Sequence, residues 1–168
     1  MREHFDPYQV LQSLERHRVT YIVIGALGRV IHGSTEQTNG IDIVPSTREE
    51  NLRRLGLALE ELNARHVDGK VPALERDLVG RGVLELRTDA GELKIVPEPA
   101  GTRGYDDLRR RAERAPLGRG LRPSVASADD HARMLAVLAR ERDRSALQTM
   151  ERVIELEHGR RRGISIER

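Results

Sequence analysis

Hydrophobic and polar positions along the chain follow two spacings, one typical of helices and one typical of strands. Residues 6–17 open with an Asp-Pro pair, which starts a helix, and carry an apolar stripe at helical spacing. The run 21–24 is continuously apolar and ends at Gly25, which predicts a strand buried on both faces. A shorter helix is predicted over about residues 26–31, and Gly33 breaks it.

A polar stretch over residues 34–40 leads into a second apolar strand at 41–45. Ser46 and Glu49 have the spacing of a capping box, in which each side chain bonds a free backbone N–H of the other. The helix that they would open carries leucines on one face as far as Leu62.

The second half of the chain adds a hairpin and then helices. After a loop around residues 69–72, strands 82–87 and 92–96 alternate with period two around a turn at 89–91, which predicts a hairpin. Further helices are predicted over about 105–112, after the capping residue Ser127, and over about 144–158, where Gly159 would stop the last one. Strands alternating with helices favour an α/β or α+β fold with a mixed sheet covered by helices.

Composition narrows the class of protein without changing this fold. The 168 residues are 38% hydrophobic and 33% charged, which suits one globular domain over 1–168. The net charge is only +2 and aromatic residues are 2%, so neither number indicates nucleic-acid binding. The chain has no cysteine and no apolar run near the roughly 20 residues of a membrane helix, so we expect a cytoplasmic protein with no membrane contact.

A glycine turn and an acidic residue on the following strand are the main chemical signal. Gly25 and Ala26 follow the first strand, thirteen residues separate Ala26 from Gly40, and Asp42 lies two residues further on. This arrangement resembles the DNA polymerase β-like nucleotidyltransferase superfamily, whose signature is a small-residue turn followed by a strand with paired carboxylates. An isolated Asp42 would otherwise be read as a strand-end aspartate in solvent.

Within that superfamily the chain looks most like the AbiEii-type proteins, which include toxins of type IV toxin–antitoxin systems. The resemblance covers about residues 6–143 and leaves 144–168 as a C-terminal helix with a basic tail. It implies the minimal nucleotidyltransferase fold with a helical C-terminal segment. The matching phrases are residues 21–27, 32–34, 38–44, 91–94, 104–108, 125–127 and 129–130.

The resemblance also implies a site for two Mg²⁺ ions, which need several carboxylate oxygens to clamp a triphosphate. Its second carboxylate matches Asp42, whereas Gly40 and Lys94 stand where the first and third belong. Glu36 replaces an arginine common in relatives, and Leu135 replaces a lysine. We expect Lys94 to lie beside Asp42 on a neighbouring strand and to take the place of the metal charge. The implied pocket positions are Gly25, Ala26, Ser34, Glu36, Thr38, Gly40 and Lys94.

Several residues keep a structural and a functional interpretation side by side. Glu92 is an exposed hairpin glutamate or a substitute metal ligand, and Ser34 is a loop cap or a phosphate contact. His32 is a structural histidine or a catalytic one. The segment 140–143, with Arg140, Arg142 and Asp143, lines the pocket or forms a solvated helix face. Arg160–Arg162 are a solvated tail or a nucleic-acid contact.

Three functions follow from these residues. The first is a nucleotidyltransferase fold that has lost metal-dependent transfer and serves in binding or regulation. The second is an active enzyme that moves a nucleotidyl group from an NTP to an RNA end, a protein or a small molecule, with Asp42 and Glu92 holding one Mg²⁺. The third is an antitoxin-like or dimeric partner protein that uses the fold only as a surface.

Overall fold

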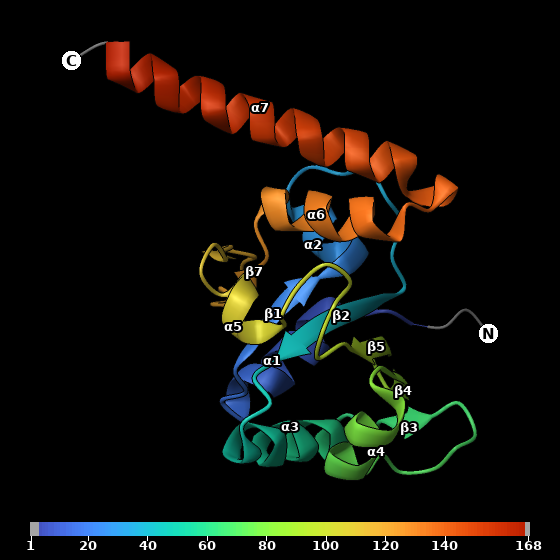
Figure 1. The fold of residues 1–168 in the computed structure, drawn as a ribbon. Helices are drawn as coiled ribbons and strands as arrows, with labels where there is room; N and C mark the ends of the chain where they lie inside the picture. Colours follow the sequence, from blue (N-terminus) through green and yellow to red (C-terminus); the bar gives the residue numbers. More distant parts are fainter. Residues whose placement is uncertain (1–3, 167–168) are drawn as a thin grey trace.

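The chain folds around one mixed seven-stranded sheet with helices on both faces (Figure 1). The computed structural model describes residues 4–166, and the strand order is β3-β4-β5-β2-β1-β7-β6. This confirms the predicted mixed sheet flanked by helices. The elements are α1 (Pro7–Arg16), β1 (Tyr21–Ile24), α2 (Gly25–Ile31), β2 (Gly40–Pro45), α3 (Glu49–Glu61), β3 (Arg65–His66), α4 (Leu74–Arg81), β4 (Leu84–Thr88), β5 (Gly91–Ile95), α5 (Tyr105–Leu108), β6 (Glu113–Arg114), β7 (Ser124–Val125), α6 (Ala128–Leu138), a 3₁₀ turn (Glu141–Asp143) and α7 (Arg144–Ile166).

Alternate residues of the central strands enter two separate apolar layers. Val23 and Ile41 belong to the larger core, which packs on α1 and α3. Ile22 and Val44 point the other way, into a smaller cluster with Met134 of α6. Figure 1 shows the resulting layers, with α3 and α4 below the sheet and α2 and α6 above it. Asp42 and Lys94, which alternate with core residues, therefore face the α6 side.

Two of the predicted helix caps are confirmed and one is wrong. The Asp6 carboxylate accepts hydrogen bonds from two backbone N–H groups at the start of α1, and Ser127 Oγ accepts one from Asp130 N at 3.0 Å. The expected capping box at Ser46 does not form, and α3 begins at Glu49 without a side-chain cap. Asn51 of α3 explains this difference. Its Nδ2 donates hydrogen bonds to the carbonyls of Ser46 and Thr20 and so holds the segment that precedes the helix.

Three segments differ from their predicted extents. Helix α4 lies between the loop predicted around residues 69–72 and the predicted strand 82–87, and no pattern indicates it because its apolar stripe is weak and Val79 is 91% exposed. Helix α5 ends at Leu108 and is followed by turns. Helix α7 does not stop at Gly159 but continues to Ile166, because a glycine in a helix interior costs only about 1 kcal/mol and nothing crowds this one.

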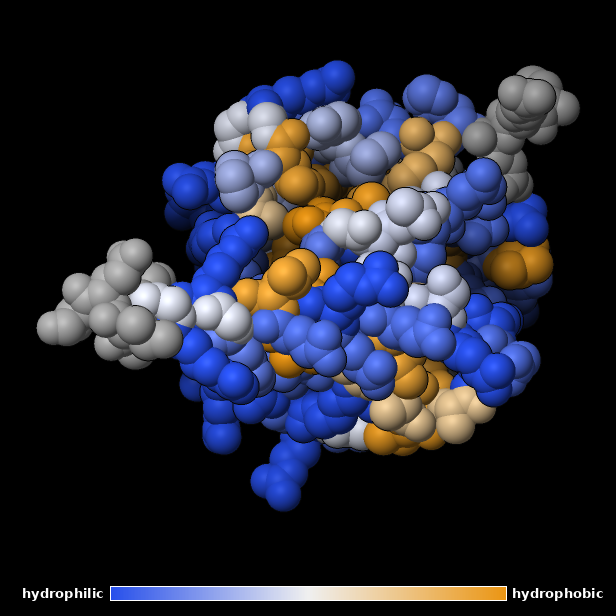
Figure 2. Space-filling view, turned by 90° about the horizontal axis from the view of Figure 1, so that it is seen from above, coloured by the Kyte–Doolittle hydropathy of each residue, from blue (hydrophilic) through white to orange (hydrophobic). Residues whose placement is uncertain are grey.

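Helix α7 is held by its first half and extends away from the body (Figure 1). Met150 is fully buried and packs with Leu135 of α6, whereas Leu156 is 60% exposed. From above, the surface is mostly hydrophilic, and its hydrophobic residues lie in separate groups (Figure 2). Within residues 4–166, no helix combines the length and apolar composition that a bilayer crossing requires.

Replacing Met150 should test this anchoring. Met150→Ala is expected to lower the free energy of unfolding by about 2–4 kcal/mol, because it leaves a cavity between α6 and α7. Leu156→Ala, further along the same helix, should change it by less than about 0.5 kcal/mol. Urea denaturation followed by circular dichroism measures both, and equal effects would show that α7 is not anchored at Met150.

Candidate functional site

A cavity of about 420 Å³ lies on the α6 side of the sheet, over strands β2, β5 and β4. Its floor consists of the side chains that alternate with core residues on these three strands. Ala26 and Thr38 also line it, as does the exposed Val67. The floor residues are Gly40, Asp42, Glu92, Lys94, Glu85 and Arg87.

The floor residues form two rows that cross the three strands. In the first, which we call the Asp42 row, Asp42 pairs in register with Lys94, and Lys94 pairs with Glu85. In the second, the Gly40 row, Gly40 pairs with Glu92, and Glu92 with Arg87. Charges of opposite sign therefore alternate along and between the rows, which stabilises cross-strand neighbours.

The Asp42 carboxylate lies against the glycine turn. Gly25 has a φ of +70°, and a Cβ added there would stand 2.3 Å from Asp42 Oδ2. Glycine is therefore required both by the backbone conformation and by the contact. The glycine turn and the Asp42 carboxylate, which fifteen residues separate in the sequence, are thus neighbours in space.

Burial raises the pKa of Asp42 above its ordinary value, and the charges of Lys94 and Arg29 oppose this rise without cancelling it. The predicted neighbour is present, since Lys94 is the register partner of Asp42. A close ion pair between them is not confirmed. Lys94 Nζ lies 3.5 Å from Glu85 Oε1, and no Asp42–Lys94 pair within 4.0 Å occurs in the described part of the chain. Lys94 thus acts on Asp42 from a distance while bonded to Glu85.

Position 40 has no space for a side chain. A Cβ built on Gly40 would stand 2.4 Å from the carbonyl oxygen of Glu92 and 2.8 Å from its Cβ. Thr38 Oγ1 also donates a hydrogen bond to the Gly40 carbonyl at 2.7 Å, which fixes the start of β2. The first carboxylate that the resemblance implies is therefore excluded by the backbone of β5 as well as by the sequence.

Glu36 and Ser34 lie outside the cavity, in an ion pair with α2. Arg29 donates two hydrogen bonds to the Glu36 carboxylate, at 2.7 and 2.6 Å, and Ser34 Oγ donates a third at 2.7 Å. Burial raises the pKa of Glu36, but the bonds from Arg29 and Ser34 outweigh it and leave the pKa below its ordinary value. The arginine expected near position 36 is thus replaced by a carboxylate that binds an arginine from the neighbouring helix.

Other predicted positions have structural contacts away from the cavity. His32 Nε2 lies 2.8 Å from the Ala126 carbonyl oxygen, which supports its structural interpretation. Arg140 pairs with Asp143 at 2.5 Å beside a separate hollow between α6 and α7, and Arg142 is exposed. Leu135, at the position of the expected lysine, is 3% exposed and packs on α7.

A buried histidine that no sequence pattern indicates lies next to helix α2. His131 is 1% exposed, and neither ring nitrogen has a hydrogen-bond partner within the described residues. Burial, followed by the charges of His32 and Arg29, lowers its pKa to about 3. A Cβ on Gly28 would stand 2.7 Å from its ring, so His131 acts as a neutral spacer between α2 and α6.

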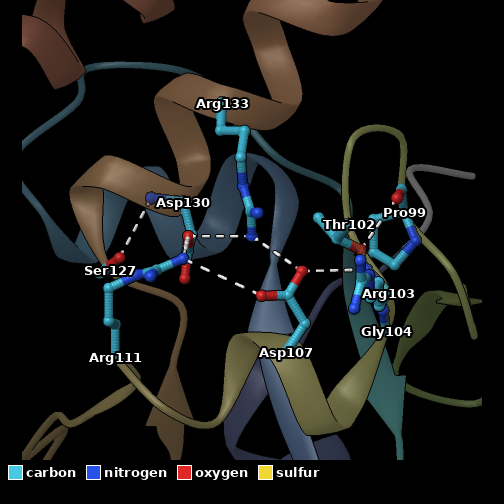
Figure 3. A network of polar contacts seen from close by, with 9 residues as sticks. All are labelled: Pro99, Thr102, Arg103, Gly104, Asp107, Arg111, Ser127, Asp130 and Arg133. Carbon is cyan, nitrogen blue, oxygen red and sulfur yellow. Dashed lines mark hydrogen bonds and ion pairs between the residues drawn. The ribbon is translucent and has the colours of Figure 1, made fainter.

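A second polar network ties α5 to α6 (Figure 3). Asp130, 1% exposed, accepts hydrogen bonds or ion pairs from Arg111 at 2.6 Å and Arg133 at 3.1 Å. Arg133 also bonds Asp107 at 3.1 Å, and Arg103 N donates to the same carboxylate at 2.9 Å. The backbone bond from Arg103, followed by the arginine charges, lowers the pKa of Asp107 despite some burial. This network holds the loop that leads from β5 to α5.

The residues in the cavity do not fit a paired Mg²⁺ site. Hard cations need several oxygen ligands, yet no group of three metal-ligating side chains occurs within residues 4–166. Gly40 cannot carry a ligand without a backbone shift, and the third position offers an ammonium group. Three carboxylates line the cavity, those of Asp42, Glu85 and Glu92.

Comparison with known proteins shows the fold. No family model matches the chain, and no curated protein sequence does. Among solved structures, the lincosamide antibiotic adenylyltransferase LnuA, bound to lincomycin, has a TM-score of 0.59 at 15% identity, over 89% of this chain and 99% of that one. The antibiotic-resistance factor ANT(2'')-Ia gives 0.56 at 13% identity, over 95% and 92%. A candidate nucleotidyltransferase of Thermotoga maritima, TM1012, gives 0.52 at 17%, over 99% and 98%. The chain therefore has a nucleotidyltransferase fold.

Adding one methyl group at position 40 should test how closely β5 approaches β2. Gly40→Ala is expected to destabilise the protein by about 1–3 kcal/mol, because the added carbon overlaps the Glu92 carbonyl. Gly56→Ala is the control, since its nearest atom would be 3.8 Å away and helix α3 should gain about 1 kcal/mol. Denaturant unfolding measures both, and a Gly40→Ala variant as stable as the parent would contradict the closed position.

The raised pKa of Asp42 predicts a pH-dependent stability. The folded state holds this proton more tightly than the unfolded state, so its stabilising contribution is present below the ordinary pKa of 3.8 and is lost as pH rises through the folded value. Asp42→Asn should therefore raise the melting temperature at pH 7, and the gain should shrink as pH falls toward 4. The exposed Asp68→Asn controls for loss of one charge, and a gain that is independent of pH would refute the assignment.

Proposed function

We propose that this protein is a nucleotidyltransferase-fold domain with lost or strongly reduced metal-dependent transfer, and that its cavity serves in binding or regulation. The observation that carries the proposal is the Asp42 row, in which the cross-strand partner of Asp42 is Lys94 rather than a carboxylate. The fold itself agrees with that of the solved nucleotidyltransferases.

The charge of the cavity also supports this proposal, and this argument does not depend on the number of carboxylate ligands. Two Mg²⁺ ions about 3.5–4 Å apart require a site rich in negative charge. Here Lys94 already supplies one positive charge to this surface and is bonded to Glu85. A divalent cation at this carboxylate would have to displace or repel the ammonium group.

The charged side chains next to the cavity already have partners within the protein, so they do not need a phosphate. Arg29 is the nearest helix cation, and Glu36 accepts two hydrogen bonds from it. A triphosphate that entered the cavity would meet three carboxylates and two cations on the floor. We infer that a bound ligand is polar and makes hydrogen bonds to both signs of charge, and that an NTP is held weakly if at all.

The AbiEii-like resemblance bears on the biological role. It suggests a component of a toxin–antitoxin pair, in which a protein without transfer activity acts through a partner protein or an RNA. An antitoxin-like or dimeric interaction protein is the form of this proposal that needs no ligand in the cavity.

One observation favours an active alternative. Asp42 and Glu92 line the same cavity, in adjacent register rows. Together they would hold a single Mg²⁺ whose remaining ligands are phosphate and water oxygens. Such an enzyme would transfer a nucleotidyl group from an NTP to an RNA end, a protein or a small molecule.

Labelled nucleotides separate these alternatives. The protein is incubated with each α-labelled NTP, Mg²⁺ or Mn²⁺, and total RNA or protein acceptors. We expect no transfer of label, and we expect Mg²⁺ alone to leave the melting temperature unchanged, since a ligand that does not bind cannot stabilise the fold. Transfer that Asp42→Ala abolishes would overturn the proposal.

Lys94 variants supply the matched test. Lys94→Asp puts a second carboxylate beside Asp42 without altering Gly40, so Mg²⁺ should now raise its melting temperature. Lys94→Ala removes the ammonium group without adding a ligand and should respond less. If both variants ignore Mg²⁺ as the parent does, the Lys94 charge is not what excludes the ion.

A further inference from the structure

A cluster of arginines surrounds a cleft of about 490 Å³ at the other edge of the sheet. The cleft lies over β1 and β7, where Ile22 and Ser124 form its floor. Arg109, Arg110 and Arg114 stand around it, and all three are exposed. We call this surface the arginine cleft.

The arginine cleft belongs to the most basic part of the chain. Residues 103–122 contain seven arginines and three carboxylates, a net charge of +4. The whole protein carries +2, so the remaining residues together carry −2. Arg111 is paired with Asp130 of α6, so the positive charge at the cleft comes from Arg109, Arg110 and Arg114. A cluster of cations attracts polyanions over distances set by the ionic strength.

Few carboxylates neutralise this cluster. Arg109 lies 3.5 Å from Asp106, in a pair that is exposed on both sides. Arg114 donates to the carbonyl of Arg122 at 3.3 Å rather than to an acid. Within residues 4–166, Arg110, Arg114 and Arg122 have no carboxylate within 4.0 Å. Their guanidinium groups keep free N–H donors, which suit the paired oxygens of a phosphate.

The backbone that carries these arginines is held in place. β6 pairs with β7 through Arg114 and Ser124, and Leu117 N donates to the Leu121 carbonyl at 3.0 Å across the connecting turn. Arg119 at that turn stacks over the Tyr8 ring, 4.1 Å from its centre. Arg114 and Arg119 are therefore presented on a fixed scaffold, which lowers the entropy lost when an extended ligand binds.

The arginine cleft is distinct from the cavity over Asp42. α5 and β7 lie at the opposite end of the sheet from β4 and β5 (Figure 1). The two share no lining residue. A ligand of the cleft therefore does not depend on the function proposed for the cavity.

We propose that the arginine cleft binds the phosphodiester backbone of a nucleic-acid duplex, without reading its sequence. Tyr105 is the one aromatic residue among those that line the cleft, while Tyr21 is 5% exposed and Tyr8 is covered by Arg119, so no series of rings is available to stack successive bases. A membrane surface fits less well, because none of the large exposed apolar side chains belongs to residues 103–122. A duplex offers regularly spaced phosphates to arginines without requiring either feature.

Fluorescence anisotropy with a labelled duplex of about 16 base pairs, as RNA and as DNA, tests this proposal. The parent protein should bind both at 50 mM salt, with a logarithmic affinity that falls linearly with the logarithm of the salt concentration. The variant Arg109→Gln, Arg110→Gln, Arg114→Gln should bind at least about tenfold more weakly, and its salt slope should fall by about 3. Because all three residues are exposed, its melting temperature reports whether the fold is retained.

The matched control is Arg48→Gln, Arg53→Gln, Arg54→Gln, which removes the same charge from α3 on the other face of the sheet. It should bind the duplex nearly as tightly as the parent. The proposal is overturned if the parent does not bind at 50 mM salt, if both triple variants lose affinity equally, or if the cleft variant keeps its affinity. It is also overturned if single-stranded RNA, an acidic phosphopeptide or vesicles of anionic lipid bind more tightly than either duplex and lose binding in the cleft variant.

Discussion

The charge pairing between strands β2, β5 and β4 is the constraint on which the polar side of this sheet depends. Asp42, Lys94 and Glu85 occupy one register row, so the Lys94 ammonium group lies between carboxylates on the two neighbouring strands. Asp42 is partly buried, so its charge would be costly without a cation nearby. The alternation of charge along the row offsets this cost and leaves a polar cavity above the strands. The same alternation leaves that cavity poor in uncompensated negative charge, so one electrostatic arrangement determines both the stability of the surface and the chemistry that it supports.

A second set of paired charges lies beside helix α2. Glu36 stands where relatives are expected to carry an arginine, and Arg29 of α2 occupies its carboxylate. The bond from Ser34 completes a closed group that needs no external anion. The Arg29 guanidinium is therefore already paired, and a phosphate would have to compete with Glu36 for it.

Local sequence patterns predicted the elements whose physical cause is local. The caps at Asp6 and Ser127, the apolar strands and the hairpin all depend on neighbours in sequence, and they were predicted. Ser46 was misassigned because its role is set by Asn51, and α4 was missed because Asp77 and His66 hold it through a tertiary contact at 2.8 Å. Glu85 and Arg87 were missed in the site, because a turn over 89–91 would pair Leu86 with Lys94, whereas the structure pairs Thr88 with Gly91 and so brings Glu85 opposite Lys94. The ion pair between Lys94 and Glu85 depends on side-chain geometry, which the spacing of residues along the sequence does not predict.

The closed environment of Gly40 imposes an order on any sequence change at this site. Substitutions at Lys94 or Glu85 replace side chains that reach into open volume, so each is accessible in a single step. A side chain at position 40 first requires the main chain of β5 to move away from β2. Directed evolution from this sequence would therefore explore the β5 and β4 positions readily but would meet a backbone barrier at β2. Gly40, which has no side chain, is therefore the residue of the cavity floor that is hardest to replace.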